Sequence, residues 1–248
     1  MSTASLHSLP ETATDPAALR QDLAAAFRIC HQMGWSESVG NHFSAAVSED
    51  GARFLLNPRW QHFATIRPED LLLLDSGDET VLDGPDAPDA SAWCVHGTLH
   101  RKKPEAKVIL HCHSPYATAL SCLADPTVVP IDNNTARFYG RTAYDRDFGG
   151  IADAEEEGER LADSLGDKSV LVMANHGVTV TGETVAAAFE DLYFFEKAAQ
   201  TLILARSTGA PLAVLSDAVA QNTADGWRAY AGMAERHFDF LKSQLPAL

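Results

Sequence analysis

Apolar positions along this chain recur with two periods, one typical of helices and one typical of strands. Between Leu19 and Cys30 they follow helical spacing behind Asp15-Pro16, a capping residue and a proline at the first helical position, which predicts a helix ending near Gly34. Three short apolar runs follow, separated by Asp-Gly, Asn-Pro and Arg-Pro: 43–47, 54–56 and 71–74. This pattern is typical of consecutive strands of one sheet.

The rest of the chain mixes further helices and strands. We expect helices at 90–102, 114–123, 152–165, 184–206 and 216–241, and strands at 107–113, 169–174 and 178–180. The elements do not alternate strictly, and neither a repeat nor a linker divides them. This organisation predicts an α/β fold in which helical layers cover a sheet, with residues 1–14 as a mobile N-terminal tail and 15–248 as a single domain.

The net charge argues against two classes of binding partner. The 248 residues include 19 Lys and Arg against 34 Asp and Glu, a formal net charge of −15. A surface this acidic argues against binding to nucleic acid or to an anionic membrane. The chain has no run of about 18 apolar residues and begins without a basic, apolar leader, so we expect a cytoplasmic protein.

Two histidines stand two residues apart at the end of an apolar run, in Val108-Ile109-Leu110-His111-Cys112-His113. Side chains two apart in a strand point to the same face of the sheet. Two imidazoles side by side suit one divalent ion, although two half-buried histidines bonded to neighbouring groups would show the same spacing.

A third histidine follows another apolar run, in Val172-Met173-Ala174-Asn175-His176-Gly177, beside a glycine that permits a tight turn. Three histidines at strand ends can form a three-nitrogen site with open coordination positions, as expected of a catalytic metal. His96 and His100 are spaced four apart on a predicted helix, but they lack a glutamate after the first histidine and a further ligand. We interpret that pair as structural.

Several longer motifs are shared with one known family. They are NHFS (41–44), LNPRWQHF (56–63), a segment ending in Val95-His96, RKKPEAKVILHCHSPYATALS (101–121), DFGG (147–150) and ANHGVTVTG (174–182). On these motifs, which span nearly the whole chain, the sequence resembles the class II aldolase/adducin family, whose best-known enzymes are fuculose-phosphate aldolase and ribulose-phosphate epimerase.

The resemblance implies a fold, an assembly and a metal site. The fold is a three-layer α/β/α arrangement with a central, mainly antiparallel sheet flanked by helices, and the assembly is a homotetramer with active sites at subunit interfaces. The ligands carried over from the family's motifs are His111, His113 and His176, for one divalent metal ion per subunit. Zinc is the expected ion, with manganese or iron(II) as alternatives.

The sequence departs from the family's enzymes at its proton-transfer residues. Phosphate-sugar aldolases have a catalytic glutamate four residues before the histidine that corresponds to His96, where this chain has Ala92, which can neither carry a proton nor bind a metal. The family also uses a tyrosine from a neighbouring subunit, shortly before an FG turn, as a proton donor. Tyr144, offset by one residue ahead of Phe148-Gly149, is the best match and our candidate catalytic residue, and Tyr230 is a weaker match.

The region of the family's phosphate grip also differs. It carries His42, Asn57, Arg59 and Trp60, where small polar residues are common. A guanidinium binds a carboxylate through two hydrogen bonds, and an indole covers an aromatic or apolar group. These residues predict a substrate with a carboxylate or aromatic acid group in place of a sugar phosphate, unless Arg59 is a surface or interface residue.

Together these features predict a divalent-metal-dependent lyase. It would cleave a carbon–carbon bond next to a carbonyl, by retro-aldol reaction or decarboxylation, in a small, non-phosphorylated hydroxy or oxo acid, since a metal stabilises the anion common to both reactions. Two alternatives stay open. Three neutral histidines also suit a non-haem iron(II) oxygenase, and Ala92 together with the adducin resemblance permits a non-catalytic interaction module.

Overall fold

A seven-stranded mixed sheet runs through the centre of the computed structural model, which describes residues 16–84, 87–150 and 155–247. Its order is β3-β2-β1-β4-β7-β6-β5; β5 and β6 pair in parallel and the other neighbours are antiparallel. The strands are β1 (His42–Ala46), β2 (Arg53–Leu56), β3 (Leu72–Asp75), β4 (Val108–Cys112), β5 (Thr142–Asp145), β6 (Val170–Met173) and β7 (Gly177–Gly182). The tail predicted at 1–14 lies outside the described residues.

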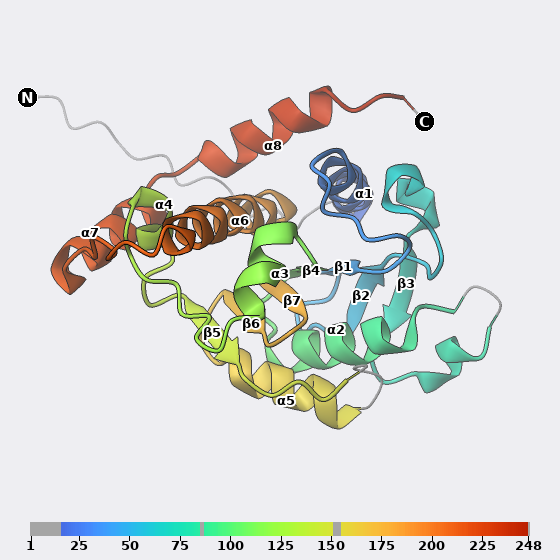
Figure 1. The fold of residues 1–248 in the computed structure, drawn as a ribbon. Coiled ribbons are helices and arrows are strands. Elements are labelled where there is room, and N and C mark those ends of the chain that lie inside the picture. The colour runs from blue at the N-terminus through green and yellow to red at the C-terminus, as the bar shows by residue number, and fades with distance from the viewer. Residues whose placement is uncertain (1–15, 85–86, 151–154, 248) are drawn as a thin grey trace, which may run out of the picture.

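Helices cover both faces of this sheet (Figure 1). One face carries α2 (Ala90–Lys102) and α5 (Glu155–Leu165), and the other carries α1 (Pro16–Gln32), α3 (Pro115–Ser121) and α6 (Val185–Ser207). Two further helices, α4 (Asn133–Arg137) and α8 (Met233–Ser243), pack on α6, and α7 (Asp217–Arg228) packs on α4. The short 3-10 helices are η1 (Phe63–Thr65), η2 (Pro68–Asp70) and η3 (Glu79–Leu82). This arrangement confirms the predicted three-layer α/β/α fold. In the described ranges, no helix is long and apolar enough to cross a membrane.

Each layer interface has its own apolar core. Phe27, Phe43 and Phe63 contact one another between the sheet and α1, with ring centroids 4.6–5.1 Å apart. A smaller cluster, which includes Leu99 and Leu171, joins α2 and α5 to the opposite face. Cover on both faces explains why a strand such as β6, Val-Leu-Val-Met, is buried at every position.

Three details of the expected elements differ from the structure. The single helix expected at 216–241 is two helices, α7 and α8, because Gly232 adopts a left-handed conformation (φ 81°) that does not occur inside a helix. No element is predicted at 132–137, where the structure has α4, whose start is stabilised by a hydrogen bond from Thr135 N–H to the Asp132 carboxylate (2.8 Å). The edge strand β5 has no predicted counterpart, since three of its four residues are only half-buried and its apolar pattern is weak.

Candidate metal centre

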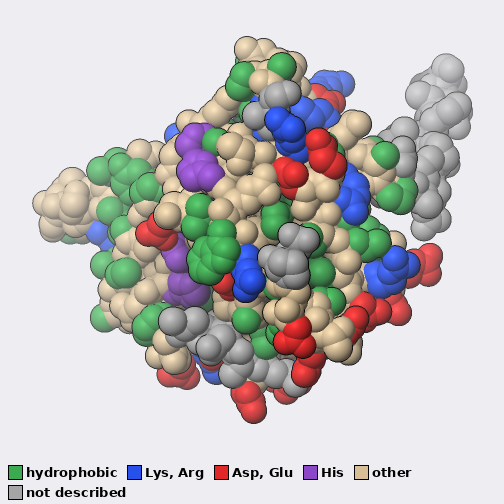
Figure 2. Space-filling model, turned by 90° about the vertical axis from the view of Figure 1, so that its right-hand side faces the viewer, with side chains coloured by type: hydrophobic (Ala, Val, Ile, Leu, Met, Phe, Trp, Pro, Cys, Tyr) green, Lys and Arg blue, Asp and Glu red, His purple; other side chains and the backbone are tan. Residues whose placement is uncertain are grey.

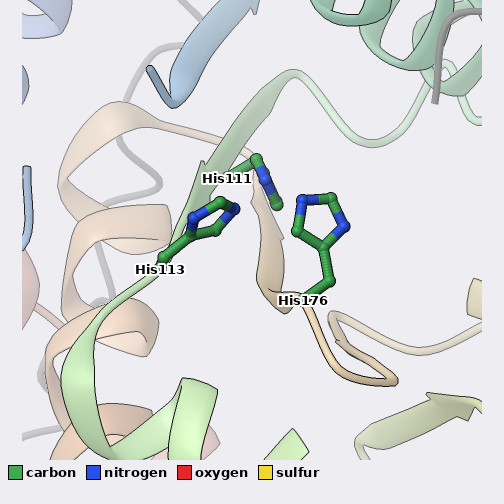
Figure 3. A group of neighbouring side chains, drawn as sticks. All are labelled: His111, His113 and His176. Carbon is green, nitrogen blue, oxygen red and sulfur yellow. The ribbon is translucent and has the colours of Figure 1, made fainter. Parts of the chain in front are cut away.

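The three histidines proposed as ligands come together at one end of the sheet. His111 lies on β4, His113 follows its last residue, and His176 lies in the turn between β6 and β7. Because β4 pairs with β7, that turn lies beside the end of β4. One ligand atom from each histidine lies within 4.8 Å of the others, and Figure 3 shows the three rings turned toward one another.

The close approach of these two chain segments requires a glycine at position 177. A Cβ atom on Gly177 would lie 2.7 Å from the carbonyl oxygen of Cys112 and 2.8 Å from the ring of His113. Asn175 adopts a left-handed conformation (φ 56°), which short polar side chains tolerate better than most. The Asn-His-Gly sequence is therefore what allows His176 to lie against the end of β4.

Two neighbouring side chains orient the rings of His111 and His113. The hydroxyl of Thr179 donates to the sulfur of Met173 (3.3 Å), so its oxygen accepts from His111 Nδ1–H (3.2 Å). The carboxylate of Glu37 accepts from His113 Nδ1–H. Both bonds leave Nε2 as the nitrogen available to a metal. His113 Nε2 is buried and has no hydrogen-bond partner in the described part of the chain, which fits a ligand.

Burial keeps His111 and His176 uncharged at neutral pH. It lowers the pKa of His111 well below its usual range, and the neighbouring histidines add to this effect. It lowers the pKa of His176 to about 4, reinforced by His113 and opposed by the carboxylates of Glu157 and Glu37. Neutral imidazole is the form that binds a metal, so the donor set, the charge state and the geometry fit one divalent ion.

A pocket of about 740 Å³ opens over the three histidines, and its walls include His42, Asn57, Arg59 and Trp60. Figure 2 shows histidine side chains at the surface, in one place next to hydrophobic and basic side chains. Trp60 is 69% exposed and has a left-handed φ of 64°, a strained conformation for a bulky residue. Arg59 has no hydrogen-bond or ion-pair partner among the described residues. The amide of Asn57 instead accepts from Phe43 N–H (3.3 Å) and so shapes the start of β1.

Three residues singled out in the sequence lie elsewhere in the single chain. The hydroxyl of Tyr144 accepts a hydrogen bond from Val128 N–H (2.8 Å), and its ring packs on the larger core outside the pocket, where burial raises its pKa. Tyr230 is exposed between α7 and α8. Ala92 is buried against β2 and β3, whereas its neighbour Ser91 lines the pocket.

Two carboxylates that sequence reasoning missed line the pocket, Glu37 and Asp89. Burial acts to raise the pKa of Asp89, but hydrogen bonds from Ser91 and from the N–H of Ala92 outweigh it and hold the pKa below its usual range. An aspartate directly before a predicted helix is a detectable capping signal. Glu37 gives no such signal, because the histidine that it contacts lies 76 residues away in the sequence.

Comparison with known proteins connects these features to one family. Residues 21–203 match the family model described as Class II Aldolase and Adducin N-terminal domain. The crystal structure of an aldolase II superfamily protein from Pseudomonas syringae is 30% identical, with a TM-score of 0.84 and coverage of 95% of this chain and 94% of that chain.

Two Streptomyces proteins are similar in sequence. Decarboxylase NovR of Streptomyces niveus is 26% identical, over 86% of this chain and 81% of its own length. The 4-hydroxy-3-prenylphenylpyruvate oxygenase/4-hydroxy-3-prenylbenzoate synthase of Streptomyces roseochromogenus subsp. oscitans is 25% identical, over 86% of this chain and 79% of its own length.

Proposed function

Because the chain belongs to the class II aldolase and adducin family, we propose that it is a divalent-metal-dependent lyase. It cleaves a carbon–carbon bond adjacent to a carbonyl, by retro-aldol reaction or decarboxylation, in a small, non-phosphorylated hydroxy or oxo acid. The observation that carries this proposal is the convergence of three imidazoles beneath an open pocket. The similarity to a decarboxylase supports the reaction class.

His111, His113 and His176 would hold one ion per subunit, with zinc as our first choice and manganese or iron(II) as alternatives. A bound ion supplies positive charge that stabilises the negative charge developing on a substrate oxygen as the bond breaks. Glu37 and Thr179 keep two of the ligand rings in position. Three nitrogen ligands leave room for substrate oxygens in the coordination sphere.

Proton transfer must involve other residues, because Ala92 has no ionisable group. Retro-aldol cleavage needs a base for the substrate hydroxyl, and both reactions need an acid that returns a proton to carbon. Asp89, an ionised carboxylate in the pocket wall, is our candidate base. Tyr144 lies outside the pocket of its own chain, so its proposed role as the acid requires a homotetramer with interfacial sites, in which a neighbouring subunit supplies it.

The pocket wall favours an acid substrate, since the guanidinium of Arg59 has no hydrogen-bond or ion-pair partner among the described residues and lines the same pocket as the exposed rings of Trp60 and Phe148. A charge-assisted pair contributes about 1.5–3 kcal/mol, so Arg59→Ala should weaken binding of an acid substrate by about ten- to a hundredfold. Calorimetry would measure the affinity, with Arg53→Ala, an exposed arginine of β2, as the control. Efficient cleavage of sugar phosphates by both variants would contradict the assignment of Arg59.

The reaction class is tested by loading the purified, untagged protein with zinc, manganese or iron(II) and screening oxo and hydroxy acids without oxygen. We expect carbon dioxide or an aldehyde to be released by the wild type and by His31→Ala, a histidine of α1 outside the pocket. His111→Ala and His113→Ala should bind negligible metal and release no product. Equal, negligible metal in the wild type and in these variants would refute the proposal.

One alternative has its own support, because a similar protein is named an oxygenase. Neutral histidines around an open coordination sphere also suit iron(II) and dioxygen. Product formation that depends strictly on oxygen and iron(II), followed with an oxygen electrode, would replace the lyase by a non-haem oxygenase. Binding of acids without turnover across the whole panel would favour a non-catalytic module.

A further inference from the structure

A buried polar network connects β1 to α2 behind the wall of the pocket. His42 and Ser44 of β1 point to the same face of the sheet, and His96 and His100, one helical turn apart on α2, face them. We call these four residues the β1–α2 network. Its hydrogen bonds join His42 Nδ1 to His96 Nε2 (2.7 Å), His96 Nδ1 to Ser44 Oγ (2.5 Å), Ser44 Oγ to His100 Nε2 (2.7 Å) and His100 Nδ1 to the carbonyl of Ala106 (3.1 Å).

The imidazoles of this network are uncharged. Its hydrogen bonds include no carboxylate, and the attraction between His42 and the nearby carboxylate of Asp89 does not offset the cost of burying a charge on the ring. Burial lowers the pKa of His100 to about 3 and the pKa of His96 well below its usual range. Each ring therefore carries one N–H group and one bare nitrogen.

The carbonyl of Ala106, at one end of the network, sets the direction of every hydrogen bond in it. A carbonyl only accepts, so the hydrogen of His100 is on Nδ1 and its Nε2 accepts from the hydroxyl of Ser44. The oxygen of Ser44 then accepts from His96 Nδ1–H, and His96 Nε2 accepts from His42 Nδ1–H. His42 Nε2 is left as the bare nitrogen at the end of the network.

This nitrogen belongs to the pocket and not to the metal ligands. His42 lines the pocket, and no hydrogen bond from a described residue reaches its Nε2. Its ring stacks on His111, the residue opposite it across β1 and β4, with ring centroids 4.8 Å apart and an interplanar angle of 27°. The three-histidine group does not include it.

We propose that the tautomer of His42 is set by the hydrogen bonds that connect it through His96, Ser44 and His100 to the carbonyl of Ala106. In this tautomer, His42 Nε2 is a hydrogen-bond acceptor in the pocket. His100, Ser44 and His96 are positioning residues, and His42 selects the ligand. A carboxylate or keto oxygen has no hydrogen to offer this nitrogen, whereas a hydroxyl does. A bare Nε2 therefore favours a hydroxy acid as the substrate. This choice of ligand rests on the proposed function.

The tautomers can be measured directly in zinc-loaded protein labelled with 15N at histidine. Long-range 1H–15N correlation spectra at pH 7, assigned with single histidine variants, should show hydrogen on Nδ1 and a bare Nε2 for His42, His96 and His100. Hydrogen on Nε2 of His42, or on both of its nitrogens, would overturn the inference. This readout needs neither substrate nor turnover.

The positioning role is tested by Ser44→Ala, which removes the group that relays direction between His100 and His96. In this variant His42 should populate both tautomers, whereas Ser44→Thr, which keeps the hydroxyl, should preserve the wild-type tautomer. Ser121→Ala is the matched control, since Ser121 is equally buried but donates only to the carbonyl of Thr118 (2.8 Å). Unchanged tautomers in Ser44→Ala would contradict the positioning role of Ser44. If Ser44→Ala does not fold, the wild-type spectrum still decides the tautomer of His42.

The ligand class is tested with glycolate and acetate, which differ by one hydroxyl. Glycolate should shift the 15N resonance of His42 Nε2, and acetate should not. His42→Phe should weaken glycolate binding about two- to tenfold more than acetate binding. No shift at high glycolate concentration would overturn the hydroxyl assignment. If the protein shows the expected tautomers but cleaves no acid, only the proposed function is refuted. If it cleaves an acid but His42 carries its hydrogen on Nε2, only this inference is refuted.

Discussion

The ligand histidines show how a single neighbour decides which nitrogen an imidazole offers. The carboxylate of Glu37 accepts from His113 Nδ1–H and raises the basicity of the opposite nitrogen. Glu37→Gln keeps the size of the side chain but removes its charge. Partners of this kind contribute about ten- to a hundredfold to metal affinity, so zinc should bind more weakly by that factor.

Competition with a chromophoric chelator would measure this change. Glu105→Gln, at an exposed position away from the pocket, is the control and should bind zinc like the wild type. Equal zinc affinities in the two variants would mean that the Glu37 contact does not support the metal centre.

His100 gives the folded state a pH dependence of predictable sign. Burial lowers its pKa to about 3, against the opposing effect of its bond to Ala106, whereas in the unfolded chain the pKa is about 6.5. Below about pH 6.5 the unfolded chain takes up a proton that the folded chain does not bind until about pH 3. The free energy of unfolding therefore falls as the pH decreases through this range, by at most about 1.4 kcal/mol per pH unit from this residue.

Urea unfolding at several pH values between 7 and 4 would measure this slope. His100→Gln should reduce it. Leu99→Ala, at a fully buried neighbouring position without a titrating group, should lower stability by about 2–5 kcal/mol at every pH and leave the slope unchanged. A His100→Gln slope equal to that of the wild type would show that this histidine does not titrate as described.

At the scale of elements, α6 holds α3 in place through one buried carboxylate. Glu196 accepts hydrogen bonds from the hydroxyl of Ser114 (2.7 Å) and from the N–H groups of Tyr116 and Ala117 (2.8 Å each), at the positive end of α3. Because Ser114 follows His113 directly, this contact also fixes the backbone beside the metal centre. Glu196→Gln loses the charge and places an amide donor among N–H donors.

We expect Glu196→Gln to lower the free energy of unfolding by about 1.5–3 kcal/mol and to weaken zinc binding as well. Denaturant titration and zinc competition would measure both effects. Glu235→Gln, at an exposed position in the first turn of α8, should change neither. Lower stability with unchanged zinc affinity would show that α3 and the ligand turn are not coupled.

At the scale of the whole molecule, the outer helices leave apolar side chains uncovered. Val219 on α7, Phe240 on α8 and Tyr230 between them are 50–66% exposed. Contiguous exposed apolar patches mark contact surfaces, and we expect these side chains to contribute to one between subunits. The net charge of −15 opposes association, so salt should strengthen it by screening.

Light scattering coupled to size exclusion should therefore give the mass of a tetramer for the wild type. Val219→Asp combined with Phe240→Asp should give a smaller species, whereas Gln221→Asp combined with Ser243→Asp, which adds the same two charges at exposed polar positions of α7 and α8, should not. A monomeric wild type at micromolar concentration would contradict both the assembly and the role of Tyr144 that depends on it.

The sequence by itself determined the features that depend on neighbours along the chain. The bounds of α2, residues 90–102, follow from its cap at Asp89, and every strand of the sheet except β5 follows from a short apolar run between turns. The spacing of His111 and His113 and the Asn-His-Gly turn identify the candidate ligands, because strand alternation and a required glycine are local properties. The family resemblance then supplied the three layers and the mainly antiparallel character of the sheet.

Only the tertiary structure decided which distant residues meet. It buried Ala92 against the sheet, kept Tyr144 out of the pocket of its own chain, and brought Glu37 to His113 and His42 to His96. Periodicity predicts which face of a helix or strand is apolar, but not which polar groups oppose each other across two packed layers. Register between strands and layers sets those contacts, and they determine which protons the histidines carry.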